Sequence, residues 1–240
     1  MGRIDLANNF AITPLQSHPS EIRRSELSLS PRELDWFLIN FALIPARYFA
    51  PLVFGDAEPA LLDYLPFFTN MFLHGGWLHL ILNMWTLWLF GPTIEDRLGP
   101  GRYLVFYLVC GALASATDAA FNSTSTVPAP GASGAIAGVL GCYVRLFPFA
   151  RIIVLVPILF LPFFFEVYAF VFVGLWFAVQ VLQGTAELFA SSTGGVVWWA
   201  HIGGFVAGLA FGTLLTRSKQ RYRTYYGDEG ILGFTPLGRR

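Results

Sequence analysis

Apolar residues gather into long runs between about residues 72 and 215, and polar turns separate these runs. Runs of this kind predict membrane-spanning helices, because the hydrocarbon core of a bilayer requires about 20 apolar residues in a helix. The five predicted spans are Phe72–Ile94, Tyr103–Phe121, Ala132–Leu146, Val167–Leu182 and Trp198–Leu215. Pro157 and Pro162 interrupt the apolar run before the fourth span, so a short interfacial segment is expected there.

Residues 1–66 are more polar than the rest of the chain. The apolar stretch Trp36–Ile44 is too short to cross a bilayer and predicts an interfacial or packed helix. The sequence Ser30-Pro31-Arg32-Glu33 is typical of a helix start. We therefore expect a polar amino-terminal segment and extracytoplasmic loop over 1–66, a membrane domain over 67–217 and a basic cytoplasmic tail over 218–240. No signal-peptide pattern is visible.

Composition supports a polytopic, all-α membrane protein. Only 12% of the residues are charged, whereas a soluble domain carries about 25%. The charged residues between Tyr103 and Thr216 are Asp118, Arg145, Arg151, Glu166 and Glu187. The formal net charge is zero, so the chain has no overall positive field for nucleic acid. Cys110 and Cys142 lie in apolar runs and are expected to be small buried residues.

The distribution of arginine and lysine predicts the orientation. Arg97 and Arg102 lie in one turn between spans, Arg145 and Arg151 lie in another, and the segment after residue 216 is basic. The opposite loops, around 122–130 and 184–197, contain no lysine or arginine. By the positive-inside rule, the basic turns and the carboxyl terminus are cytoplasmic. The expected location is a bacterial plasma membrane.

Four polar residues fall at one depth in three of the predicted spans. His79, Asn83, Ser133 and His201 lie roughly 18 to 24 Å above the charged cytoplasmic end of their helices, at about 1.5 Å per residue. Polar side chains inside hydrocarbon are costly and indicate a functional site. His79 and Asn83 are four residues apart and therefore share a helix face.

Glycines spaced four residues apart follow both Ser133 and His201 in the sequence. Gly134 and Gly138 follow the serine, and Gly204 and Gly208 follow the histidine. Small residues at this spacing allow membrane helices to approach backbone to backbone. Such a crossing would bring the serine hydroxyl, a nucleophile, within reach of the imidazole as general base. His79 and Asn83 could then donate hydrogen bonds to a developing oxyanion.

Each residue alone has a more ordinary interpretation. Ser133 or Asn83 could join helices through a hydrogen bond, and His201 could pair with a carbonyl or serve a proton relay. His74, His79 and His201 could bind a metal, although no Asp, Glu or Cys lies at the same depth to complete a ligand set. A transporter or channel with a polar site at the midplane is a further alternative, but no inverted repeats are visible.

Three motifs together resemble the rhomboid family of intramembrane serine proteases. They are His74-x4-His79-x3-Asn83, Gly131-Ala132-Ser133-Gly134, and Ala200-His201-x2-Gly204-x3-Gly208. The resemblance covers residues 64–217, and Gly91–Gly99 resembles the turn that follows the first of these motifs in the family.

The resemblance implies a Ser–His dyad, with Ser133 as nucleophile and His201 as base. The oxyanion would be held by the Ser133 backbone N–H, His79 and Asn83, with His74 supporting them. Gly131, Gly134, Gly138, Gly204 and Gly208 would be structural. The implied substrates are single transmembrane segments within the lipid bilayer, cut near their extracytoplasmic end, with no metal or cofactor. No oligomeric state is predicted.

The chain departs from the family pattern in three places. The family core has six spans, and the span expected before the first long loop is missing. The segment 63–67 lacks the family's Trp-Arg pair, and Ala137 occupies a position where many members carry an aromatic residue beneath the histidine. The missing span motivates an alternative function: a catalytically inactive rhomboid-like protein that binds transmembrane clients.

Overall fold

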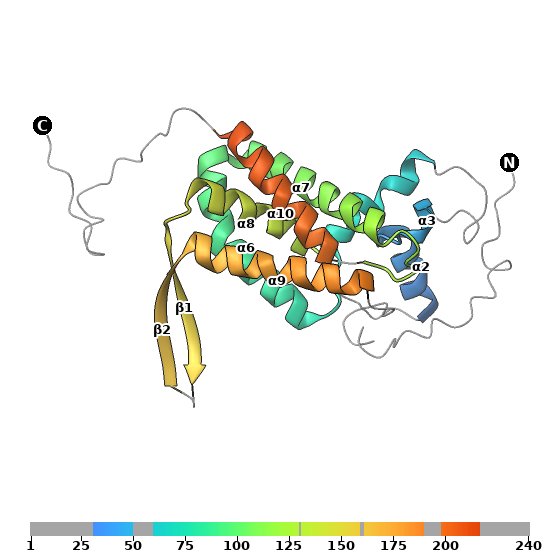
Figure 1. Cartoon of the computed structure of the whole chain (residues 1–240). Helices are drawn as coiled ribbons and strands as arrows, with labels where there is room; N and C mark the ends of the chain where they lie inside the picture. The colour runs from blue at the N-terminus through green and yellow to red at the C-terminus, as the bar shows by residue number, and fades with distance from the viewer. Residues whose placement is uncertain (1–30, 50–59, 130, 159–160, 190–197, 217–240) are drawn as a thin grey trace, which may run out of the picture.

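The computed structural model describes residues 31–49, 60–129, 131–158, 161–189 and 198–216. Its elements are α2 (Pro31–Phe41), α3 (Ala46–Phe49), η1 (Leu61–Tyr64), α5 (Pro66–Thr69), η2 (Asn70–Phe72), α6 (Trp77–Leu98), α7 (Pro100–Phe121), α8 (Ser133–Leu146), β1 (Arg151–Ile158), β2 (Leu161–Tyr168), α9 (Ala169–Phe189) and α10 (Trp198–Leu215). Helices α6 to α10 form a bundle, and the short amino-terminal helices lie at one end of it (Figure 1). The predicted class, an all-α polytopic membrane protein, is confirmed, with the addition of one β-hairpin.

Helix α8 is the centre of the bundle. Its residues from Gly134 to Cys142 are all buried, and it packs against α6, α7 and α10. With 14 residues it is about 21 Å long, shorter than the bilayer core. Helices α7, α9 and α10 are long and apolar enough to cross a membrane, and they expose large apolar side chains such as Leu104, Leu175 and Leu214. The outer helices therefore face lipid and enclose α8.

Helices α8 and α10 are parallel and touch through their backbones. A Cβ atom added to Gly204 would overlap the carbonyl oxygen of Gly134, and one added to Gly208 would overlap that of Gly138. The predicted close crossing is thus observed, residue by residue. Because no side chains separate the helices at these positions, α8 and α10 can approach more closely than the usual 8 to 10 Å between helix axes.

The bounds of two predicted spans, the first and the fourth, need the largest corrections. The first span begins at Trp77 and not at Phe72, because residues 70–72 form a 3₁₀ turn and Gly75 and Gly76 follow in a loop. It also continues through Pro92 to Leu98. The fourth span begins at Ala169, after the segment expected to be interfacial, and extends to Phe189.

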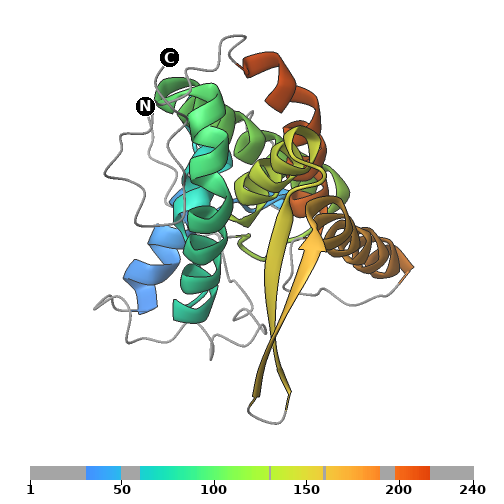
Figure 2. The same ribbon diagram turned by 90° about the vertical axis from the view of Figure 1, so that its left-hand side faces the viewer.

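The segment before α9 is an antiparallel hairpin of β1 and β2, which extends away from the bundle in both views (Figures 1 and 2). Pro157 pairs with Pro162 beside its turn, and the strands are rich in β-branched and aromatic residues, which favour extended structure. An exposed ion pair joins Arg151 and Glu166 at 2.7 Å near its base. Most of its other described side chains are apolar and exposed.

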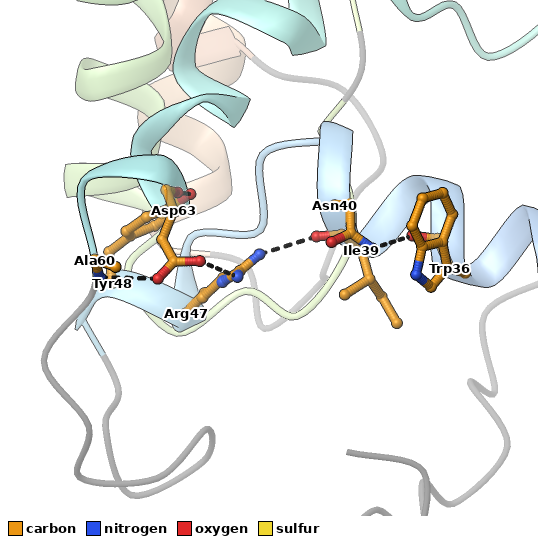
Figure 3. Close-up of polar contacts among 7 residues, drawn as sticks. All are labelled: Trp36, Ile39, Asn40, Arg47, Tyr48, Ala60 and Asp63. Carbon is orange, nitrogen blue, oxygen red and sulfur yellow. Dashed lines mark hydrogen bonds and ion pairs between the residues drawn. The ribbon is translucent and has the colours of Figure 1, made fainter. Parts of the chain in front are cut away.

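Polar contacts fix the short amino-terminal helices on one another (Figure 3). Arg47 donates to the carboxylate of Asp63 at 2.6 Å and to the carbonyl of Ile39 at 3.0 Å. The Tyr48 hydroxyl donates to the Asp63 carbonyl at 2.6 Å. Helix α2 begins at Pro31 as the sequence indicates, while Ser30, the predicted cap, and the tail over 218–240 lie outside the described residues.

Candidate active site

The amino-terminal turns of α6, α8 and α10 meet at one end of the bundle. Ser133 is the first residue of α8, and His201 and His79 lie in the first turns of α10 and α6. Helix α6 is parallel to α8, because its Phe90 ring contacts Tyr143 at 4.9 Å while His79 lies beside Ser133 at the other end. The positive ends of three helix dipoles are therefore directed at one region, which favours negative charge there.

Ser133 and His201 are in direct contact. The Ser133 Oγ lies 2.8 Å from Nε2 of His201, and Nδ1 of the same ring lies 2.7 Å from Oε1 of Gln180 on α9. An amide oxygen only accepts hydrogen bonds, so Nδ1 carries the ring proton and Nε2 accepts the Ser133 proton. A hydroxyl bonded to a free imidazole nitrogen is the arrangement of an activated nucleophile.

Gly131 brings His79 against the serine. Its φ of +147° lies in a region that side chains rarely adopt. A Cβ atom there would lie 3.2 Å from Cε1 of His79 and 3.4 Å from Oγ of Ser133, so the two side chains meet across this glycine. A side chain at position 131 would therefore be strained in its backbone and would crowd both His79 and Ser133.

N–H donors are available on Ser133 itself and on His79 and Asn83 of α6. Ser133 begins a helix, so its backbone N–H has no partner within that helix. The backbone N–H of Gly75 donates to Nδ1 of His79 at 3.4 Å, which leaves the proton of that ring on Nε2. The amide nitrogen of Asn83, one turn further along α6, is buried without a hydrogen-bond partner among the described residues. A donor of this kind is costly unless an acceptor arrives.

His74 lies in the loop before α6 rather than in the span. Its ring is 5.5 Å from that of His79, edge to face. Burial lowers the pKa of His74, and the neighbouring His79 lowers it further. His74 is therefore neutral at neutral pH and adds no charge beside His79. Across the described residues, no three His, Cys, Asp or Glu side chains gather as a metal ligand set.

A small polar cavity adjoins Ser133. It has a volume of about 20 Å³, and Asn70, Ser115, Asp118 and Gly131 contribute to its wall. The Asn70 amide donates to the Ser115 hydroxyl at 2.9 Å, so these groups are already ordered. A cavity of this size holds about one water molecule.

Sequence reasoning missed Gln180 and the cavity residues Asn70, Ser115 and Asp118 as members of the site. Gln180 is only 5% exposed and lies in the middle of an apolar helix. The criterion that selected His79 and Asn83, a polar side chain at membrane depth, would have selected Gln180 as well. No motif pointed to it.

A family model described as Rhomboid domain matches residues 62–218. The chain belongs to the rhomboid family. It is 31% identical over 159 residues to Rhomboid protein 1, mitochondrial, of Saccharomyces cerevisiae, a match covering 64% of this chain and 42% of that protein. It is 36% identical over 163 residues to Rhomboid-like protease 5 of Toxoplasma gondii, covering 64% of this chain and 16% of that protein.

A bacterial rhomboid is also similar. Rhomboid protease GluP of Bacillus subtilis is 38% identical over 100 residues, covering 40% of this chain and 19% of that protein. The chain thus spans less than half the length of each of these relatives. The matched rhomboid domain includes α6 to α10, so the region around Ser133 and His201 lies wholly within it. This rhomboid is an integral membrane protein.

Proposed function

We propose that this rhomboid is an intramembrane serine endopeptidase that cleaves transmembrane segments of membrane proteins. The single observation that carries the proposal is the 2.8 Å contact between Ser133 Oγ and His201 Nε2 inside a bundle of apolar helices. The names of its relatives, which include rhomboid proteases, point the same way.

In the proposed mechanism, Oγ of Ser133 attacks the scissile carbonyl carbon and its proton passes to Nε2 of His201. The carbonyl oxygen becomes negative and accepts hydrogen bonds from the Ser133 N–H, His79 Nε2–H and the Asn83 amide. The C–N bond then breaks, and the leaving amine takes the proton from His201. Water hydrolyses the acyl-enzyme by the same steps, and the cavity beside Ser133 is placed to supply it.

The orientation follows from charge. Arg97, Arg102, Arg145 and Arg151 all lie at the end of the bundle opposite Ser133. By the positive-inside rule this end is cytoplasmic, in the proposed setting of a bacterial plasma membrane, and the carboxyl terminus is on the same side. Cleavage then occurs near the extracytoplasmic end of the substrate segment. Helix-breaking residues in the substrate segment would favour cleavage, because the backbone of that segment must unwind to reach Ser133.

The test uses purified protein in detergent with a model single-span substrate. Wild type should cleave it, and Ser133→Ala should not. Labelling by a fluorophosphonate should depend on Ser133 and persist in Ser123→Ala, a change in the 122–129 loop. Cleavage that survives Ser133→Ala rejects the proposal. Substrate retention without cleavage or labelling in the wild type would favour the client-binding alternative.

A further inference from the structure

Gln180 is a buried amide held between two neighbours. Its Oε1 lies 2.7 Å from Nδ1 of His201, and its Nε2 donates to the Trp176 carbonyl at 3.4 Å, one turn back on α9. The second contact orients the amide, because the reverse placement would set Oε1 against a carbonyl oxygen, and two acceptors repel. The oxygen is thus directed at the imidazole by α9 itself.

This orientation determines which nitrogen of His201 is protonated. A neutral imidazole has one N–H and one free nitrogen, and either can carry the proton. With Oε1 accepting from Nδ1–H, the free nitrogen is Nε2, which faces Ser133. The other tautomer would present an N–H to the serine and leave Gln180 Oε1 buried without a donor, which is unfavourable.

Helix α9 also places an aromatic ring beside His201. Trp176, four residues before Gln180 and on the same face, has its ring centroid 5.9 Å from that of His201. Ala137, below the serine, has no side chain large enough to provide such a contact. The histidine is therefore held by α9, through one hydrogen bond and one aromatic contact.

We propose that Gln180 is a positioning residue that keeps His201 in the tautomer able to accept the Ser133 proton. This inference rests on the proposed function. When Nε2 takes the proton, both ring nitrogens carry N–H, and Nδ1–H continues to donate to Gln180 Oε1. The amide neither gains nor loses a proton. It performs the orienting task of a third residue beside a nucleophile and base without bringing a buried charge.

Substitutions that preserve the size of the Gln180 side chain distinguish this positioning role from a role in packing alone. Gln180→Met keeps length and volume but removes the strong acceptor, whereas Gln180→Glu retains an acceptor oxygen whether or not its carboxyl is ionised. Gln183→Met is the control, since Gln183 is exposed one turn further along α9. We expect Gln180→Met to lower kcat by at least about 10-fold with KM within about twofold. Gln180→Glu should restore most of kcat, and Gln183→Met should leave it unchanged.

A spectroscopic measurement reads the tautomer directly. The chain has four histidines, so ¹⁵N NMR of histidine-labelled protein is assignable with a His201 variant as reference. Wild-type His201 should show a protonated Nδ1, and Gln180→Met should populate the Nε2-protonated form. A neutral, Nε2-protonated His201 in the wild type overturns the inference without any variant.

The two proposals fail differently. If Ser133→Ala abolishes cleavage while Gln180→Met keeps the wild-type kcat, only the role of Gln180 is rejected. If cleavage survives Ser133→Ala, both the proposed function and the role of Gln180 are rejected. Should Gln180→Met fold poorly, the decision falls to Gln180→Glu and the wild-type spectrum, and a Glu variant that folds without activity counts against the inference.

Discussion

A single methyl group between α8 and α10 should separate the proposed catalytic pair. In Gly204→Ala the new Cβ would overlap the carbonyl oxygen of Gly134, which is backbone and cannot rotate away. The two helices must part by about 1.5 Å before this contact reaches an ordinary van der Waals separation. Ser133 and His201 lie on these same helices, so their 2.8 Å contact would lengthen to roughly 4.3 Å, which is no longer a hydrogen bond.

The expected loss has two parts. Overpacking of this kind lowers the free energy of unfolding by about 1–3 kcal/mol. A displacement of about 1 Å at reacting groups lowers activity by about 100-fold. The assay is cleavage of a model transmembrane substrate at a temperature where the variant is folded, with the melting temperature measured alongside.

Gly174→Ala is the matched control for this variant. A Cβ atom at Gly174, within α9, meets nothing within 4 Å. The substitution should therefore leave activity unchanged and raise stability by up to about 1 kcal/mol, as replacing glycine inside a helix does. Wild-type activity in Gly204→Ala would refute the argument that backbone contact sets the distance between Ser133 and His201.

Three further outcomes are expected. Burial raises the pKa of Tyr48 from 10.0 to about 12, so the stability that Tyr48 contributes is complete below pH 10 and is lost as the pH rises toward 12. In Tyr48→Phe, the melting temperature should therefore depend less on pH over this window. Asp63→Asn should lower the free energy of unfolding by up to about 1 kcal/mol, because its pair with Arg47 is partly exposed, and the difference should shrink in high salt. Ser133→Ala, His201→Ala and the double variant should all lose cleavage to the same background rate, since a nucleophile and its base act as a unit; a single variant that retains more activity than the double variant would contradict this.

The spans and the contact between Ser133 and His201 could be predicted because polar residues within membrane helices mark functional sites, and regularly spaced glycines mark helix contacts. Polar groups at one depth and glycines at one spacing leave few arrangements of three parallel helices. The hairpin could not be predicted in this way, since a short apolar run has the same pattern in a strand and in a buried helix. The partner of Gln180 depends on the rotation of α9, and a helix that is apolar on every face carries no pattern that reports it.

The glycine contacts between α8 and α10 also bear on how heat inactivates the protein. Side chains can change rotamer while a protein warms, but main-chain atoms in touching helices have no such freedom. Parting α8 from α10 means opening the centre of the bundle, because α8 is enclosed on its other sides by α6 and α7. Thermal loss of cleavage should therefore coincide with thermal unfolding, and no temperature range is expected in which the protein is folded but inactive.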